Sequence, residues 1–448
     1  MNKEFSSKNI LKLAWPSMIS QGVIILVGMI DLIFIGKFGT LATATVSIAN
    51  FVCVAIYTFL EGLRSGTTVL IAHFLGAKDK KNITKIFNRN LFFALCIGLS
   101  IFILAYPLSY AIYSVAWKFM ENIQIKPLGI NYLSIRLLAA PFILIFFTIT
   151  GLFRGLKNAF VPFLITAAIC ILNATLDYFF IFTNNTTIQM GISGAAIATL
   201  IAYIVGAIIS VLFLFKHKLT KPYINFKNFF SSIKNKKDVK DVNITSQIGI
   251  FSGILAAITA TFGYISTTLG PNSFVIFQLT HQAYLTIYFL ASGFLVAASI
   301  AVGKLIGAKE KQYVIPTVFK ISCIYLTIIG TLSLFLIIFS PQLANLLSPT
   351  NLLIAKVTSV TFKLVACSLF LSTLYIVLLG ALMGAKDTKF ILITETITGF
   401  LFFIPLAYLF AKHLGLGMIG GYIAFFSWTA LDSIIFSWRF YIQKKWLK

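Results

Sequence analysis

Long apolar segments separated by short polar ones dominate this 448-residue chain. A helix needs about 20 apolar residues to span a bilayer. We find about twelve such segments, which predicts an all-α integral membrane protein. The predicted spans cover residues 10–36, 44–75, 90–112, 129–153, 161–183, 191–215, 245–268, 273–306, 314–339, 352–383, 388–411 and 415–440.

Two motifs occur twice at almost the same separation. The segment LIAHFLGAKDKK around Gly76 recurs as VGKLIGAKEKQ around Gly307. The segment GLFRGLKNAFVPFLIT around Gly155 recurs as GALMGAKDTKFILIT around Gly384. The aligned glycines are 231 and 229 positions apart, so the chain consists of two copies of one unit.

This duplication predicts two pseudo-symmetric lobes of six helices each. We expect an N-terminal lobe at 1–215, a cytoplasmic linker at the polar segment 216–243, and a C-terminal lobe at 244–448. Internal duplication in a very apolar chain is typical of secondary transporters. Transport is therefore the first functional hypothesis.

The basic residues predict the orientation. If the N-terminus is cytoplasmic, 28 of the 36 Lys and Arg lie in cytoplasmic segments and five in outer segments. The remaining three, Arg64, Arg136 and Lys363, lie deep inside spans, away from the ends. This asymmetry puts both termini in the cytoplasm, and it explains the net charge of +24 by contact with anionic membrane lipid. Binding to nucleic acid is not needed to explain the charge.

Five of the twelve acidic residues lie inside predicted spans: Asp31, Glu61, Asp177, Glu395 and Asp432. A carboxylate at membrane depth costs a few kcal/mol, so such residues are usually functional or paired. They are the first candidates for a site.

Asp31 and Asp177 have similar predicted depths, roughly 8–9 Å below the outer membrane edge. Asn173 precedes Asp177 by four residues and shares its helix face, and Thr199 and Asn50 come to similar depths. Two neighbouring carboxylates cannot both ionise cheaply, so one would carry a proton at neutral pH. The oxygens of Asp31, Asp177 and Asn173 also suit Na⁺. We therefore predict a site for a coupling cation, with no structural metal and no other cofactor.

Each of these residues has a simpler interpretation. Arg136 lies at the same depth, so it would pair with Asp31 and Asp177, and such pairing is compatible with tuning a proton site. Pro16 permits a kink in the helix that carries Asp31. That kink is either a gate or a static bend.

The other acidic residues have candidate partners within the same helix. Glu61 and Arg64 are three residues apart, which favours a structural ion pair over a supporting role in transport. Asp432 lies within two turns of Arg439, and a simple pair with it is one interpretation. Glu395 has no evident partner, and its role is open, as is that of Asp432.

The order of these motifs resembles that of the multidrug and toxic compound extrusion (MATE) family, in its DNA-damage-inducible-protein-F-like branch. The matching stretches are LAWPSMIS, DLIFIGKFG, LRSGTTVLIAHFLGAKD, YLSIRLLAAP, RGLKNAFVPFLIT, ILNATLDYFFIF and GISGAAIAT, with weaker matches in the second copy. The resemblance covers the whole chain.

The resemblance implies twelve helices in two lobes that open alternately to each side of a bacterial inner membrane. It implies that a monomer exports amphipathic, often cationic small molecules in exchange for H⁺ or Na⁺. Asp31 matches the acid of the family's first helix, and Pro16 matches its bend. Asn173, Asp177 and Thr199 match the cation network of its first lobe.

The sequence departs from the family pattern in the second half. Another branch of the family carries acids in helices 7 and 10. This chain has no acid at either place, so its sequence predicts no sodium site of that kind. Relatives in its own branch often carry an acid in helix 8, where this chain has Ser299 and uncharged neighbours.

Three alternatives stay open at this point. A flippase for lipid-linked saccharides would share the fold, but it would carry more basic residues inside the membrane. An intramembrane enzyme would need clustered acids or histidines at a membrane face, and a channel would suit a symmetric site better. We therefore expect a cation-coupled antiporter and no enzymatic activity; its substrate and its coupling ion are not predicted.

Overall fold

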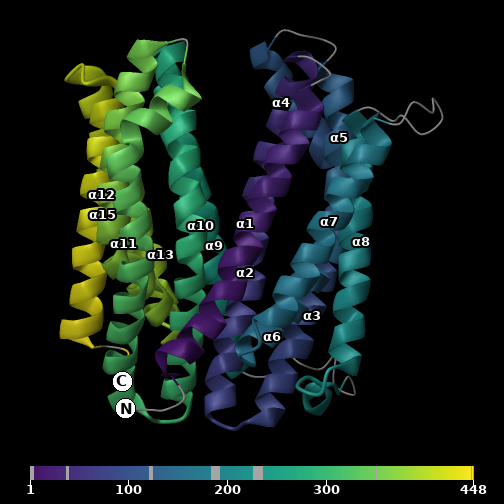
Figure 1. The fold of residues 1–448 in the computed structure, drawn as a ribbon. Helices are drawn as coiled ribbons and strands as arrows, with labels where there is room; N and C mark the ends of the chain where they lie inside the picture. Colours follow the sequence, from purple (N-terminus) through teal and green to yellow (C-terminus); the bar gives the residue numbers. More distant parts are fainter. Residues whose placement is uncertain are drawn as a thin grey trace. The chain divides into compact units, whose positions relative to one another are not determined.

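The computed structural model describes residues 5–36, 40–120, 125–182, 192–225, 236–349, 351–444 and 446 (Figure 1). Nearly all of these residues are helical, and none of them lies in a β-strand.

The first half of the chain contains eight α-helices and a short 3₁₀ turn within the described ranges. They are α1 (Ser7–Gly36), α2 (Thr40–Gly76), α3 (Lys80–Ile103), α4 (Ala105–Met120), α5 (Ile125–Leu138), α6 (Ala140–Gly155), α7 (Phe160–Phe182), α8 (Ile192–Lys216) and the turn η2 (Lys221–Tyr223).

The second half contains seven α-helices, a 3₁₀ turn and three π-helical segments within those ranges. The α-helices are α9 (Lys236–Thr268), α10 (Pro271–Gly307), α11 (Val314–Leu347), α12 (Leu352–Gly384), α13 (Thr388–Ile397), α14 (Ile404–Tyr408) and α15 (Gly417–Ser437). The 3₁₀ turn is η3 (Lys311–Tyr313), and the π-helical segments are η4 (Thr398–Phe403), η5 (Leu409–His413) and η6 (Trp438–Gln443).

All twelve predicted spans lie on a helix or on a run of consecutive helices. Eleven helical segments of the described chain are long and apolar enough to cross a membrane. The prediction of an all-α membrane protein is confirmed. Two spans consist of two helices each, interrupted at Leu104 and at Ala139. Pro141 lies in the first turn of α6, where a proline is tolerated.

The chain forms two compact units. The first unit comprises Ile19–Phe74 and Asp79–Gly249, and the second comprises Met1–Met18, Leu75–Lys78 and Ile250–Lys448. The second unit therefore includes the beginning of α1. A side chain at Gly293 of α10 would clash with that segment of α1, which shows how closely the two helices pack.

Close glycine contacts join helices at equivalent places in the two units. In the first unit, α6 packs on α2 through the GxxxG pair Gly151 and Gly155. A Cβ atom at Gly151 would lie 2.7 Å from the carbonyl oxygen of Arg64, and one at Gly155 would lie 2.7 Å from the side chain of Ile71. Only glycine permits this approach.

The second unit repeats this contact with α12 and α10. Its GxxxG pair is Gly380 and Gly384, and a Cβ atom at either glycine would clash with a backbone carbonyl oxygen, that of Leu295 or of Ser299. Leu295 is the repeat equivalent of Arg64, because the two positions differ by the same 231 residues that separate the duplicated motifs. The duplication thus extends to individual helix contacts.

Four equivalent turns follow α2, α6, α10 and α12, and each has a lysine in the left-handed region. The φ angles of Lys78, Lys157, Lys309 and Lys386 are 56°, 64°, 61° and 64°. The N–H of the residue after each lysine bonds to a carbonyl five residues earlier, which is the Schellman arrangement. A lysine there places positive charge at the negative end of the helix dipole.

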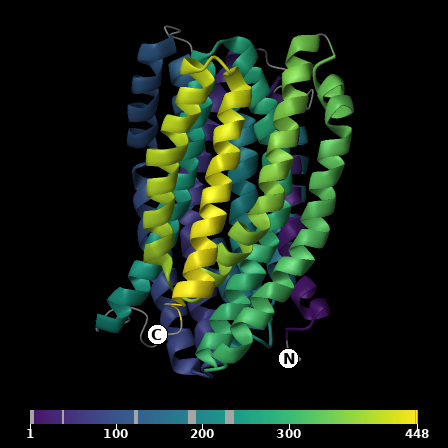
Figure 2. The same ribbon diagram turned by 90° about the vertical axis from the view of Figure 1, so that its left-hand side faces the viewer.

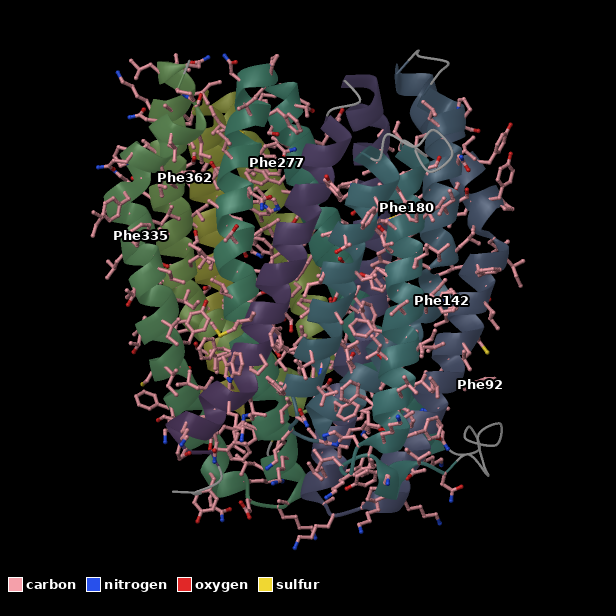
Figure 3. All side chains as sticks on the ribbon, turned by 45° about the vertical axis from the view of Figure 1, so that its right-hand side comes forward. Phe92, Phe142, Phe180, Phe277, Phe335 and Phe362 are labelled. Atoms are coloured by element: carbon pink, nitrogen blue, oxygen red, sulfur yellow. The ribbon has the colours of Figure 1, made fainter. Side chains whose placement is uncertain are left out.

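An aromatic cluster fills the interior of the second unit. The ring of Phe262 contacts those of Phe277, Phe403 and Tyr422, with centroids 5.2–5.4 Å apart. In Figure 3, Phe277 lies among the helices of this unit, while Phe335 of α11 points outward from its edge. The exposed fraction of Phe335 is 52%, as expected for a side chain that faces lipid.

We expect Gly384→Ala to destabilise the protein by about 1–3 kcal/mol, because the new methyl group must push α12 away from the Ser299 backbone. Gly22→Ala is the matched control, since no atom lies within 4 Å of a Cβ atom at that position. Thermal unfolding in detergent measures both variants. Equal melting temperatures for Gly384→Ala and the wild type would contradict the close contact.

Candidate functional site

Asn173 and Asp177 form the centre of a buried polar network in the first unit. Both side chains project from the same face of α7, because four residues separate them. The Asn173 amide donates to Oδ2 of Asp177 at 3.1 Å. Their exposed fractions are 6% and 0%, so the Asp177 carboxyl lies in the interior of the unit. At membrane depth, such a carboxyl is a strong functional candidate.

Thr199 of α8 connects this pair to Arg136 of α5. Its Oγ1 lies 3.5 Å from Nδ2 of Asn173 and 3.3 Å from Nη1 of Arg136, and both nitrogens donate to it. The Thr199 hydroxyl itself donates to the carbonyl of Ala195 at 3.0 Å. The hydroxyl thus joins three helices, and it brings the Arg136 guanidinium into the same network as Asp177.

Tyr132 extends the network to α2. Its hydroxyl accepts from Nη1 of Arg136 at 3.3 Å and lies 3.5 Å from Oδ1 of Asn50, to which it donates. A second tyrosine, Tyr57 of α2, donates its hydroxyl proton to the backbone carbonyl of Arg136 at 2.7 Å. Neither tyrosine was predicted from the sequence. Tyr132 precedes Arg136 by four residues, and that spacing on one helix face was the available signal.

Five of the predicted site residues therefore lie in one network. They are Asn50, Arg136, Asn173, Asp177 and Thr199. The contact with Thr199 and Tyr132 agrees with the interpretation in which Arg136 tunes the site.

Two further predicted residues lie on α1. Asp31 is in the helical part of the chain, but its side chain lies outside the described residues. Pro16 is buried inside α1, which continues through it as a helix. Pro16 belongs to the second unit and Asp31 to the first, and the boundary between the units falls at Met18 and Ile19, within one turn of Pro16.

Glu61 and Arg64 form the ion pair that their spacing predicts. The Arg64 side chain is 4% exposed, whereas that of Glu61 is 35% exposed. The guanidinium of Arg64 also lies 4.7 Å from the ring centroid of Phe147. These contacts give Arg64 a structural role in holding α2 against α6.

The interpretation of Asp432 and Arg439 as a pair is wrong. Arg439 instead binds Asp387, with its Nε and Nη2 atoms 2.7 and 2.9 Å from the two carboxylate oxygens. Seven residues along a helix separate Asp432 from Arg439 by about 10 Å, whereas the turn before α13 brings Asp387 directly to the guanidinium. The ring of Phe390 covers the same guanidinium at 4.3 Å.

The network has the composition of a cation site. The Asp177 carboxyl can take up a proton, and its oxygens, the Asn173 amide oxygen and the Thr199 hydroxyl are hard ligands that suit Na⁺. The described residues contain no cluster of three or more His, Cys, Asp or Glu that would hold a metal ion.

The fold agrees with comparisons to known proteins. The sequence model described as MatE matches residues 16–179 and 237–409, which together are most of the chain. This protein belongs to the MATE family. The resemblance that the sequence motifs indicated is thereby confirmed, and the chain is a multi-pass membrane transporter.

Curated relatives of this MATE protein match over nearly their whole length. The "Probable multidrug resistance protein NorM" of Thermotoga maritima is 24% identical, and the match covers 98% of this chain and 93% of that protein. The "Uncharacterized transporter YisQ" of Bacillus subtilis is also 24% identical, with 99% and 96% covered.

A solved structure shows the same fold. It is described as the outward-facing conformation of a multidrug resistance MATE family transporter, and it matches with a TM-score of 0.87. The sequence identity is 23%, and the match covers 98% of this chain and 96% of that one. The two-lobed arrangement of twelve membrane helices is therefore that of this protein.

We expect Thr199→Val to destabilise the protein by about 1–3 kcal/mol, because Arg136 and Asn173 each lose a buried acceptor. Thr199→Ser keeps the hydroxyl and should restore stability. Thr175→Val is the control, since the Thr175 hydroxyl is exposed on the same helix as Asn173 and donates to a backbone carbonyl of its own helix. Thermal unfolding in detergent measures all three, and a Thr199→Val protein as stable as Thr175→Val would contradict the network.

Proposed function

We propose that this MATE transporter exports amphipathic, often cationic small molecules in exchange for H⁺ or Na⁺. The observation that carries the proposal is the buried network around Asp177, because an acid at this depth needs a functional reason. Two of the relatives described above carry names that refer to multidrug resistance. These names support a drug-like substrate.

The coupling cation binds at Asp177 and Asp31 in this proposal. Uptake of a proton by Asp177 would remove its charge and weaken the hydrogen bond from Asn173. Asn173 and Arg136 both donate hydrogen bonds to the Thr199 hydroxyl. A change at Asn173 therefore alters the contacts of α7 with α8 and, through Thr199, with α5. A Na⁺ ion would act on the same oxygens. Either cation drives transport only if it binds the two conformations with different affinity.

Pro16 is the proposed hinge of α1. A proline removes one hydrogen bond of the helix, so bending there is easier than elsewhere. The beginning of α1 belongs to one compact unit and the remainder to the other. A bend near Pro16 would let the segment that carries Asp31 move without moving the segment that precedes the proline.

The flippase alternative has little in its favour. Only three basic residues lie seven or more residues from both ends of a predicted span, and of these Arg64 is paired with Glu61. Arg136 belongs to the polar network rather than to a separate anion site. Both observations favour an exporter of neutral or cationic compounds over a carrier of anionic lipid-linked cargo.

The proposed location is a bacterial inner membrane, with the protein acting as a monomer. The excess of Lys and Arg in alternate loops places both termini and the linker in the cytoplasm. The four lysines of the equivalent turns, Lys78, Lys157, Lys309 and Lys386, all lie in loops of this cytoplasmic set.

We expect Asp31→Asn and Asp177→Asn to lower gradient-driven efflux at least about tenfold, because an amide cannot exchange a proton and is a poorer ligand for Na⁺. The measurement uses purified protein in liposomes, a fluorescent cationic dye, and a pH gradient or, separately, a Na⁺ gradient. Glu310→Gln, outside the spans, is the matched control.

Loss of transport in both variants, with Glu310→Gln unaffected, would identify the antiporter and its coupling ion. Wild-type efflux by a folded Asp31→Asn protein would contradict the assignment of that residue. A folded wild-type protein that transports the dye under neither gradient would contradict the antiporter itself and favour a lipid-linked substrate.

We expect a green fluorescent protein fused after Lys448 to fluoresce in bacterial cells, and an alkaline phosphatase fused there to be inactive. The first folds in the cytoplasm and the second needs the periplasm, and the basic residues keep that end inside. The same fusions inserted at 184–190 should give the opposite pair of results. An active phosphatase after Lys448 would refute the proposed orientation.

A further inference from the structure

Two buried carboxyl groups of the second unit lie outside the network described above. Glu395 of α13 is 0% exposed, and Asp432 of α15 is 2% exposed. The ion pairs found among the described residues include neither of them. Arg439, the nearest basic residue to Asp432 along the helix, is bound to Asp387 instead. Carboxyl groups this deep usually have a paired cation or are neutral.

Each carboxyl has hydrogen-bond donors on one side and an oxygen without a partner on the other. The Tyr375 hydroxyl of α12 donates to Oε1 of Glu395 at 2.7 Å. The hydroxyl of Thr398 hydrogen bonds to Asp432, and it accepts a bond from Nε1 of Trp428 at 3.0 Å. The remaining oxygens, Oε2 of Glu395 and Oδ1 of Asp432, are fully buried and have no hydrogen-bond partner.

No cation faces this pair in the described structure. The titratable groups within electrostatic range of Glu395 are Asp432 of α15, Tyr375 of α12, and Tyr284 and Tyr288 of α10. A tyrosine hydroxyl can donate a hydrogen bond but carries no positive charge at neutral pH. Two ionised carboxylates would therefore repel each other without compensation.

The surroundings are aromatic and apolar. The ring of Phe403 stacks on that of Trp428 with centroids 4.8 Å apart, and the ring of Phe436 packs edge-on against Tyr375 at 5.5 Å. A charge in such an environment is costly, whereas a neutral carboxyl with one hydrogen bond is tolerated. The second of these contacts joins α12 to α15, and these two helices run side by side (Figures 1 and 2).

The backbone around Glu395 is also unusual. The π-helical segment η4 begins at Thr398, three residues after Glu395, and contacts α15. A π-helical turn adds about one residue per turn and is frequently found at functional sites. Here it carries both Thr398, which reaches Asp432, and Phe403, which covers Trp428.

We propose that Glu395 and Asp432 together bind one exchangeable proton, which makes this pair a second protonation site, separate from the network at Asp177. One carboxyl holds the proton and is neutral, so it does not repel the charge of the other. When the proton leaves, repulsion between the carboxylates loosens the packing of η4 on α15. The proposal does not depend on Asp31 or Asp177, because the two sites share no residue.

Infrared spectroscopy of purified protein tests the proposal without a transport assay. The C=O stretch of a protonated carboxyl is distinct from that of a carboxylate, so spectra recorded from acidic to alkaline pH follow the proton. We expect a C=O band that titrates in the wild type and in the controls Asp177→Asn and Glu310→Gln. The double variant Glu395→Gln/Asp432→Asn should lose the part of this band that these two carboxyls contribute, while any part from Asp177 remains.

Tyr375→Phe provides a milder variant if the double variant does not fold. It removes the hydrogen bond to Glu395 and keeps both carboxyls, so the band should shift in position while it still titrates. A band unchanged by both substitutions would overturn the proposal, as would a wild-type band that never titrates. Disappearance of the band on addition of Na⁺ at constant acidic pH would also overturn it, because the pair would then bind sodium.

Discussion

Hydrocarbon offers no hydrogen-bond partners, so every polar group at membrane depth must find its partner inside the helix bundle. This constraint explains why Arg136, Thr199 and Asn173 are joined so tightly in the first unit. Each hydroxyl or amide forms a hydrogen bond with a neighbour on another helix. The Asp177 carboxyl belongs to the same network, because it accepts a hydrogen bond from Asn173. A change of charge at Asp177 must therefore be compensated by rearrangement of its neighbours, because water is not available to compensate it.

The same constraint limits where helices can approach one another. In both units, a GxxxG pair lets a helix backbone lie directly on its partner, at Gly151 on α2 and at Gly380 on α10. Lipid supplies little hydrophobic force between helices, so such close contacts provide much of the packing energy. The repeated lysine turns after α2, α6, α10 and α12 then close the helix ends. Rigid units of this kind are what a carrier needs if a local change at a site is to move whole helices.

Much of the architecture followed from the sequence because its signals are local. Apolar length predicted the spans, and four-residue spacing placed Asn173 beside Asp177. Contacts between distant segments gave no such signal, and the pairing of Arg439 with Asp387 was therefore missed. The π-helical turn after Glu395 was missed for a similar reason, since tertiary packing rather than local residue preference produces it.

The central claim is that the coupling cation binds at Asp177. The most direct measurement is the charge displaced when a pulse of acid or of Na⁺ reaches substrate-free protein on a solid-supported membrane. The account predicts that one of the two cations displaces charge in the wild type and in Glu310→Gln, and that Asp177→Asn displaces clearly less. Equal displacement by a folded Asp177→Asn protein would contradict it.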